Sequence, residues 1–471
     1  PVTASQTFTS DGTKKVLDMH FNFDSSALGG KTVVVCEKLT YGDYVAATEE
    51  DMENKDQTIY FPEIHTTATD SETADHLTLA DSRAVITDTV TYTNLLKGET
   101  YTLSGVLMDK DTGKELLVDG EPVTQEMSFT AGRASGTKKL KFEFDTTGLA
   151  GKSFVVYETL TLEDVEVAEH KDINDEGQTI HIPAAQTTAT DDSSKINVSE
   201  AKKEVSVTDT VAYRNLVPGK EYTVRGTAVD KETGEPLTDA DGNELVSTAK
   251  FTAASADGSV DVKFTFDGTA MAGRSVVFFE NVYYTDKLIA VHADIDDEAQ
   301  TVHIPLIFTS VKDKDTDSHM SLAGSDVTLT DTVAYRNLVP GKTYTISGTL
   351  MDQRTGKAVT VNGKAVTSSA DFTPDTADGE TTVDFHINTN GLDDTTVVVF
   401  EKMFYGKAEI AAHEDINDKG QTIYIPSVKT TAIDDKTATK LTLAEKDIHI
   451  TDTVAYRNLV PGEKYTVTGT A

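Results

Sequence analysis

The sequence predicts an all-β protein, organised as a tandem array of Ig-like β-sandwich domains that form an elongated rod. Short segments alternate apolar and polar residues with a period of two, turns rich in Gly, Pro, Asn and Asp separate them, and no longer segment has a helical period. A closing motif recurs along the chain, and its glutamines lie 121, 122 and 121 residues apart, at Gln57, Gln178, Gln300 and Gln421. A period of this length indicates repeated whole domains rather than a solenoid, and 471 residues are too many for a single core.

The repeat divides the chain into five units. They are a partial unit at residues 1–62, complete units at 63–183, 184–305 and 306–426, and a partial unit at 427–471. Residues 1–37 align without a gap with residues 122–158, so we expect the chain to begin and end inside a domain, as a fragment of a longer protein. Only nine residues separate Gln178 from Thr187 in the next unit, and so short a junction favours a stiff rod over flexibly linked beads.

The unit at residues 184–305 illustrates the expected strands in order. A first strand surrounds Thr187, and a second, EVSVTDTVAY at 204–213, is joined to a third at 221–230 by the turn NLVPGK, whose Pro and Gly are typical of a hairpin. The turn KETGEP leads to strands at 245–251, 259–266 and 274–284, and a closing strand, AQTVHIP, ends at Pro305. About seven strands in roughly 120 residues are typical of an Ig-like sandwich.

Charge and composition exclude several functions. Lys and Arg number 42 against 78 Asp and Glu, which leaves a formal net charge of −36 and argues against nucleic acid as a partner. Cys36 is the one cysteine, so no intramolecular disulfide can form, and we expect it to be a small core residue rather than a reactive thiol. No signal peptide and no apolar run of membrane length are present, so we expect no membrane insertion.

Two carboxylates per unit fall on the apolar face of a strand. Alternation points Asp209 inward beside Val207 and Val211, and Glu280 inward beside Phe278. An unpaired buried carboxylate is costly, and local backbone amides could satisfy each one separately. Alternatively the two share one proton, since like charges in a low dielectric raise one pKa strongly. The equivalent residues are Asp88, Asp209, Asp331 and Asp452, and Glu37, Glu158, Glu280 and Glu401.

A threonine, a glutamine and a histidine complete the repeated set. Alternation turns the first hydroxyl of each opening-strand pair inward and the second outward, and it turns the Gln inward on the closing strand. A lone Thr on a strand would indicate only a β-branched strand former, and a lone His in this segment would favour a solvated turn or a satisfied edge position. However, Thr and Asp are always 22 residues apart, Glu and Gln 20, and His and Gln eight. The inward residues are Thr66, Thr187, Thr309 and Thr430, with Gln57, Gln178, Gln300 and Gln421 and with His170, His292 and His413; the outward ones are Thr67, Thr188, Ser310 and Thr431.

These residue types can form a covalent bond. A Thr hydroxyl is a weak nucleophile that needs a base, which His can supply, and a Gln carboxamide is a poor electrophile unless an acid assists it, which a carboxyl pair can do. The opening and closing strands of a sandwich can lie side by side, so Thr and Gln could meet and form an ester with loss of ammonia. Proximity would then be the main source of rate.

The repeated elements also carry a family resemblance. The Thr, the DTV, the VVYE or VFFE and the H-x-D-I-N-D-x-x-Q elements resemble the Ig-like ester-bond domains of Gram-positive surface adhesins, also called VaFE repeats. In that family a Thr on the first strand is joined autocatalytically to a Gln on the last, assisted by Asp, Glu and His. The resemblance implies bonds Thr66–Gln178, Thr187–Gln300 and Thr309–Gln421, with the helpers Asp88, Glu158 and His170, then Asp209, Glu280 and His292, then Asp331, Glu401 and His413.

The partial units depart from this pattern. The leading unit has Glu37 and Gln57, but Glu49 stands where the other units have His, so its bond is in doubt. The trailing unit has Thr430 and Asp452 but no Gln partner in this chain.

The expected function is the stalk of a cell-wall-anchored bacterial adhesin, outside the cell, with no cofactor, no metal and no turnover as an enzyme. The host ligand would bind a tip domain, and the peptidoglycan anchor would also lie outside this stretch. A Lys–Asn cross-linked module is disfavoured, because no Lys recurs on the opening strand. A ligand-binding or calcium-dependent array remains the alternative, since DKDTDS at 313–318 and DINDEG at 172–177 are acidic loops.

Overall fold

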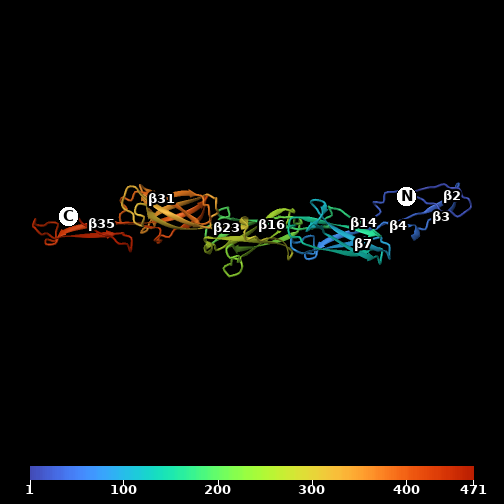
Figure 1. Cartoon of the computed structure of the whole chain (residues 1–471), viewed down its shortest axis with the longest axis horizontal. Helices are drawn as coiled ribbons and strands as arrows, with labels where there is room; N and C mark the ends of the chain where they lie inside the picture. The colour runs from blue at the N-terminus through green and yellow to red at the C-terminus, as the bar shows by residue number, and fades with distance from the viewer.

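The structure is a computed structural model that describes residues 1–471. It is an elongated all-β array in which the five units follow one another along one axis, with the two termini at opposite ends (Figure 1). Three short 3₁₀ turns, η1 (Lys55–Gln57), η2 (Thr269–Met271) and η3 (Glu298–Gln300), are the helical elements. None of them has the length and apolarity that a membrane crossing requires. The predicted fold class and rod are confirmed.

Each complete unit is a sandwich of two antiparallel sheets with its core between them. In the first, β5, β6 and β12 form one sheet in the order β12-β6-β5, and the other has the order β11-β7-β13-β14, with β15 paired to β13 and β8 to β7. The strands are β5 (Glu63–Asp70), β6 (Ala84–Thr93), β7 (Thr100–Asp109), β8 (Lys114–Glu115), β9 (Leu117–Val118), β10 (Glu121–Pro122), β11 (Thr124–Thr130), β12 (Gly136–Phe144), β13 (Ser153–Leu162), β14 (Val165–His170) and β15 (Thr179–His181).

The second and third complete units repeat this topology, with sheets β16-β17-β20 and β19-β18-β21-β22 in one and β24-β25-β31 and β27-β26-β32-β33 in the other. The second contains β16 (Ala184–Asp191), β17 (Val205–Arg214), β18 (Glu221–Asp230), β19 (Val246–Thr252), β20 (Gly258–Phe266), β21 (Arg274–Tyr284), β22 (Lys287–His292) and β23 (Thr301–Ile304). The third contains β24 (Leu306–Asp313), β25 (Val327–Arg336), β26 (Tyr344–Asp352), β27 (Lys357–Ala358), β28 (Thr360–Val361), β29 (Lys364–Ala365), β30 (Thr367–Phe372), β31 (Gly379–Ile387), β32 (Thr395–Tyr405), β33 (Ala408–His413) and β34 (Thr422–Ile425).

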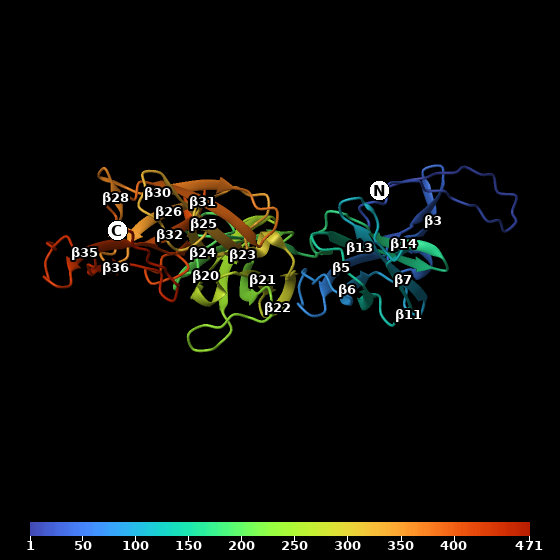
Figure 2. The same ribbon diagram turned by 60° about the vertical axis from the view of Figure 1, so that its left-hand side comes forward.

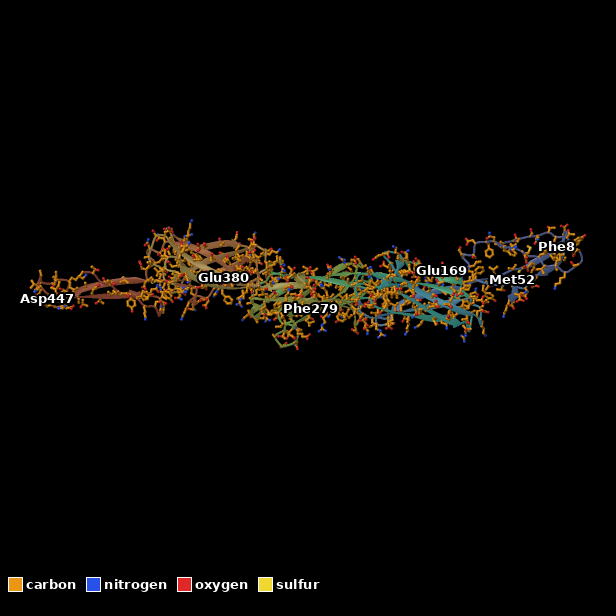
Figure 3. All side chains as sticks on the ribbon, viewed as in Figure 1. Phe8, Met52, Glu169, Phe279, Glu380 and Asp447 are labelled. Carbon is orange, nitrogen blue, oxygen red and sulfur yellow. The ribbon has the colours of Figure 1, made fainter.

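The two end units contain only part of the sandwich. The leading unit has β1 (Thr32–Val34) paired with β4 (Thr58–Tyr60) and β2 (Glu37–Tyr41) paired with β3 (Tyr44–Glu49); the trailing unit has β35 (Ser427–Asp434) paired with β36 (Ile450–Arg457). Two-stranded sheets cannot enclose a core, so apolar side chains such as Phe8 and Met52 are exposed in the leading unit (Figure 3). Figure 2 shows both end units projecting beyond the complete sandwiches.

One strand that all three complete units share is not among the seven that the sequence predicts, and the first and third units have further two-residue strands besides it. In each complete unit a hairpin follows the long apolar strand, and its return strand, β14, β22 or β33, ends at the histidine. The register places Glu158 directly opposite His170, as it places Glu280 opposite His292. Positive φ angles at Glu163 and Asp164 allow the tight turn that starts β14. The histidine therefore lies on a strand that has a fixed register with the glutamate.

The opening and closing strands do not pair as neighbours within one sheet. The opening strand β5 is the edge of the three-stranded sheet, whereas the closing strand β15 pairs with β13 in the opposite sheet. The two meet where the sheet edges converge, and the main-chain amide of Ala68 donates to the carbonyl oxygen of Gly177 at 3.0 Å. Thr66 and Gln178 thus approach each other across the seam between the sheets.

The expectation that Cys36 is a core residue is wrong, because Cys36 is exposed. The equivalent residues Tyr157, Phe279 and Phe400 are only half-buried. Each of them precedes a glutamate that points inward, and strand alternation therefore directs it to the outer face of the sheet.

Candidate functional site

Five elements bring the predicted residues of each complete unit together. In the first unit Thr66 comes from β5, Asp88 from β6, Glu158 from β13, His170 from the end of β14, and Gln178 from the turn before β15. The Asp, Glu and Gln side chains are 0% exposed in all three units, and the Thr side chains are buried. The outward neighbours, Thr67, Thr188 and Ser310, are exposed, as the alternation predicts.

In the first unit the glutamate lies between the threonine and the glutamine. The Thr66 hydroxyl donates to Glu158 Oε2 at 3.1 Å and lies 3.2 Å from His170 Nδ1. The Gln178 amide nitrogen donates to both carboxyl oxygens of Glu158 at 2.9 Å. Glu158 thus contacts both the nucleophile and the amide in a buried site, and His170 lies beside the nucleophile.

The other two complete units bring the hydroxyl and the amide into direct contact. Gln300 Nε2 donates to Thr187 Oγ1 at 2.8 Å and to Glu280 Oε2 at 2.8 Å. In the third unit Gln421 Nε2 contacts both Thr309 and Glu401, and the Thr309 hydroxyl donates to Glu401 Oε2 at 3.1 Å. The groups that would react are therefore neighbours before any bond forms.

In each complete unit the pKa values of both buried carboxyl groups are raised. Burial raises the pKa of Glu158 well above its usual range, and the neighbouring Asp88 charge raises it further. Burial also raises the pKa of Asp88. Neither oxygen of Asp88 has a hydrogen bond of good geometry, and the nearby Glu158 carboxyl and Thr67 main-chain amide oppose the rise in its pKa. A proton shared between the two carboxyl groups would complete the hydrogen bonding of Asp88. The pKa directions and causes are alike in the pairs Asp209 and Glu280, and Asp331 and Glu401.

A second aspartate contacts the histidine and was not predicted from the sequence. Asp175 Oδ2 lies 3.0 Å from His170 Nε2, on the far side of the ring from Thr66. The same contact measures 3.1 Å between Asp297 and His292 and 3.0 Å between Asp418 and His413. The available signal was a constant spacing, because this Asp follows the His by five residues and precedes the Gln by three in each complete unit.

The same aspartate also shapes the turn that carries the glutamine. Asp175 Oδ1 accepts the main-chain amide of Gly177 at 2.8 Å, and Asp297 Oδ1 accepts that of Ala299 at 2.8 Å. One oxygen therefore orients the His, and the other holds the backbone just before the Gln. This positioning role links the two sides of the site through one side chain.

The partial units retain fragments of the arrangement. Gln57 Nε2 donates to Glu37, and Glu49 stands directly opposite Glu37 where the complete units have His. Thr430 and Asp452 keep the strand register of their counterparts but are exposed. Neither unit brings all five groups together.

The acidic loops that raised the possibility of calcium are explained by local turns. Asp313 Oδ1 accepts the amides of Asp315 and Thr316 at 3.0 Å, and Asp172 Oδ1 accepts that of Asn174 at 3.0 Å. No group of three or more His, Cys, Asp or Glu side chains is arranged to hold a metal ion.

The comparisons with solved structures give low similarities. Two crystal forms of a bacterial adhesin from Mobiluncus mulieris, described as containing intramolecular disulfide, isopeptide and ester bond cross-links, align at 15% and 14% identity with TM-scores of 0.21 and 0.22. The alignments cover 54% and 58% of this chain and 88% and 93% of the adhesin. A glycosyl hydrolase family 2 member from Bacteroides cellulosilyticus aligns at 8% identity over 51% of this chain and 32% of its own, with a TM-score of 0.19. Similarities this low carry no argument about function.

One protein family matches the chain along its whole length. No curated protein matches the chain. The family model described as "T-Q ester bond containing domain" matches five consecutive stretches, residues 1–61, 62–182, 183–304, 305–425 and 426–471. These stretches cover the whole sequence, and the complete ones contain the threonine, glutamine and carboxyl pair described above. The chain therefore belongs to the family of T-Q ester bond containing domains.

Proposed function

We propose that each complete unit forms an intramolecular ester between its opening-strand Thr and its Gln. The observation that carries this proposal is the buried contact of the Thr hydroxyl, the Gln amide and the Glu carboxyl, which is clearest where Gln300 Nε2 lies 2.8 Å from Thr187 Oγ1. The bonds are Thr66–Gln178, Thr187–Gln300 and Thr309–Gln421.

The proposed reaction divides the proton transfers between two sides of the site. His170 Nδ1 removes the Thr66 proton as Oγ1 attacks the Gln178 side-chain carbonyl carbon, and Asp175 stabilises the imidazolium. This attack forms the C–O bond; the proton on the carboxyl pair then passes to the amide nitrogen, and the C–N bond breaks to release ammonia and leave the ester. The His proton then returns to the carboxyl pair. Overall, a hydroxyl and a carboxamide become an ester and ammonia.

This chemistry would occur once per unit. The ester consumes the nucleophilic Thr and the Gln, so no group remains to act on a second substrate. We therefore propose a self-modifying structural protein rather than an enzyme that turns over.

The proposed role is that of a stalk in a bacterial surface adhesin, outside a Gram-positive cell and anchored to its wall. Support comes from the tandem array, its elongated form and the acidic surface, which disfavours association between neighbouring stalks (Figure 1). The esters would resist both pulling and proteolysis. A tip domain that binds a host ligand and an anchor to peptidoglycan are the proposed partners, both outside this stretch.

The intact mass of the full chain tests the bond. Each ester removes one ammonia, about 17 Da, as a covalent change that needs no structure to detect. We expect a deficit of three such units, with branched peptides that contain Thr66, Thr187 and Thr309 after digestion. Thr187→Ala should restore the mass of one ammonia, because it removes one nucleophile.

The matched control is Thr188→Ala, which removes the outward hydroxyl of the same strand and should leave the deficit unchanged. An unmodified mass for the folded parent protein after long incubation at neutral pH would overturn the ester proposal. If Thr188→Ala restored the lost mass and Thr187→Ala did not, Thr188 rather than Thr187 would be the residue that forms the ester.

A further inference from the structure

The loop between the first two strands of each complete unit is ordered by its own hydrogen bonds. In the second unit it spans residues 192–204, and Asp191 at its start organises it: Oδ1 accepts the amides of Ser193 and Ser194 at 2.9 and 2.7 Å, and Oδ2 accepts the Ser199 hydroxyl at 2.9 Å. The Ser194 hydroxyl donates to the Val198 carbonyl oxygen at 2.6 Å. In the first unit Asp70 forms the same contacts with Glu72, Thr73 and Thr78.

The tip of this connecting loop is fixed to the closing strand of its own unit. Ser199 donates its amide to the carbonyl oxygen of His303 at 2.8 Å, and the His303 amide donates to Asn197 at 2.9 Å. In the first unit Thr78 and His76 form the same pair of bonds with His181. The loop is therefore held rigidly at the end of its own sandwich.

The apolar residue at the tip belongs to the core of the next unit. Val198 is 2% exposed and packs in the cluster that contains Ile307, Leu338, Tyr344 and Ile425 of the third unit. Leu77, which is 0% exposed, packs in the core of the second unit with Leu216, Tyr222 and Val282. Each of these two side chains thus leaves the core of its own sandwich and completes that of its successor.

An asparagine of the next unit fastens the same joint in the opposite direction. Asn337, which has a positive φ of 61°, donates its amide to the carbonyl oxygens of Arg274 at 2.5 Å and Ile304 at 3.5 Å, and its Oδ1 accepts the Ser275 hydroxyl at 3.0 Å. Asn215 forms the equivalent bonds to Lys152, Ile182 and Ser153. Each joint between two units therefore combines hydrogen bonds from an asparagine with a buried apolar side chain from the loop.

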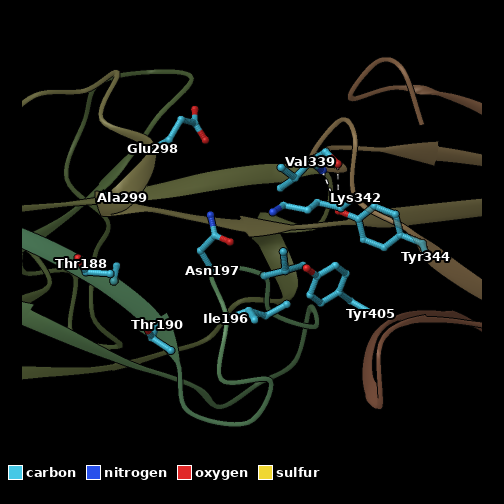
Figure 4. A pocket seen from close by; sticks show the side chains of 12 residues that line it. Thr188, Thr190, Ile196, Asn197, Glu298, Ala299, Val339, Lys342, Tyr344 and Tyr405 are labelled. Atoms are coloured by element: carbon cyan, nitrogen blue, oxygen red, sulfur yellow. Dashed lines mark hydrogen bonds between the residues drawn. The ribbon is translucent and has the colours of Figure 1, made fainter. Parts of the chain in front are cut away.

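The two joints differ beside this contact. In the first, Asp75 of the loop pairs with Lys220 and accepts the Tyr284 hydroxyl at 2.7 Å. In the second, Ile196 stands in the place of Asp75, and a cavity of about 290 Å³ remains between Ile196 and Asn197 on one side and Lys342, Tyr344 and Tyr405 on the other (Figure 4). The buried apolar side chain, Leu77 or Val198, and the asparagine contacts are common to both joints, whereas the contacts made by Asp75 and Ile196 differ.

We propose that the connecting loop is a docking element for the following repeat of the same chain. Its buried apolar residue stabilises the following unit more than the unit that carries the loop. Leu77 stabilises the unit at residues 184–305, and Val198 stabilises the unit at 306–426. Removing either contact weakens the successor more than the unit that carries the residue. This coupling is independent of the ester, because it rests on packing at the joint.

Hydrogen exchange of the full chain, resolved by peptide, tests the direction. Val198→Asp places a charge in the core of the third unit, so exchange in β26 (Tyr344–Asp352) should accelerate by at least about tenfold. Exchange in β20 (Gly258–Phe266), in the unit that carries the substitution, should change less than about twofold. Val198→Ala should act in the same direction but less strongly.

Ser193→Asp is the matched control, because it adds the same charge to an exposed position of the same loop. Hydrogen exchange in β20 and β26 should then be as fast as in the parent protein. Acceleration in β20 alone, equal acceleration in both strands, or no acceleration in β26 would overturn the proposal. If Val198→Asp fails to fold, Val198→Ala decides between the same outcomes.

Discussion

At the residue scale, the histidine and its aspartate form a matched pair. In the first unit His170 lies between the Thr66 hydroxyl and the Asp175 carboxylate, so the charge that develops on the ring during proton transfer has a partner. In the second unit His292 Nδ1 instead accepts the Thr187 main-chain amide at 3.1 Å. In the leading unit both residues change together, to Glu49 and Asn54, and the Asn54 amide donates to Glu49 at 3.4 Å. An Asp beside Glu49 would repel it, whereas an Asn can donate to it.

Asp175→Asn should slow ester formation in the first unit by about 100-fold or more. The amide keeps an oxygen that can accept the Gly177 N–H, but it loses the negative charge that stabilises the imidazolium. Time-resolved mass spectrometry of freshly purified protein would follow the loss of ammonia. Branched peptides report which unit reacts.

The control for this substitution is Asp172→Asn, because Asp172 lies in the same segment and caps Asn174 without contacting the His. It should leave the rate unchanged. Equal slowing in both variants would mean that the turn, rather than the charge beside His170, controls the reaction.

At the scale of elements, a glycine opposite the site glutamate makes room for an aromatic ring. Gly105 on β7 is directly across from Glu158 on β13, and a methyl group at Gly105 would lie 2.7 Å from Phe142 Cζ and 2.9 Å from Leu140 Cδ1. Gly226 and Gly348 have the same relation to Phe264 and Phe385. The ring packs over the glycine inside the sandwich, and the carboxyl pair of the same unit is fully buried.

Gly105→Ala should destabilise the first unit by about 1–3 kcal/mol, since the added methyl group displaces the Phe142 ring in a packed core. Scanning calorimetry should show one transition at a lower Tm. Gly132→Ala in the same unit is the control, because a methyl group there meets nothing within 4 Å. A Tm as low in Gly132→Ala would contradict the packing explanation.

At the scale of the whole molecule, the proposed bonds define the path of a pulling force. Opening and closing strands lie in opposite sheets of each unit and meet at the seam where Thr and Gln are adjacent. An ester at that seam transfers load directly between the strand that enters the unit and the strand that leaves it. The sheets between them would then remain outside the load path.

Single-molecule pulling on the full chain should therefore reveal no long extension from a cross-linked unit. Thr187→Ala frees the segment between Thr187 and Gln300, which are 113 positions apart, and at about 3.4 Å per residue this adds one extension of roughly 380 Å. Thr188→Ala should add none. Extensions of that length from all three units of a fully cross-linked parent would contradict the load path.

The site was largely predictable from the sequence because its residues occur on strands of period two. Asp88 and Glu158 are conspicuous as charges on apolar faces, and Thr66 and Gln178 share a face with apolar neighbours on their own strands. The constant spacings between these residues from repeat to repeat then indicated that they form one site. Asp175 lies in a turn, where alternation gives no direction, so its contact with His170 required the folded chain.

The sequence by itself determined the class of fold, the repeat and the inward face of each strand, since these depend on local alternation and on spacing. Only the tertiary structure decided that the opening and closing strands belong to opposite sheets, that His170 lies on a separate strand opposite Glu158, and that Val198 belongs to the core of the next unit. Those features depend on contacts between segments far apart in the chain. Alternation states which way a side chain points, but not which distant surface it meets.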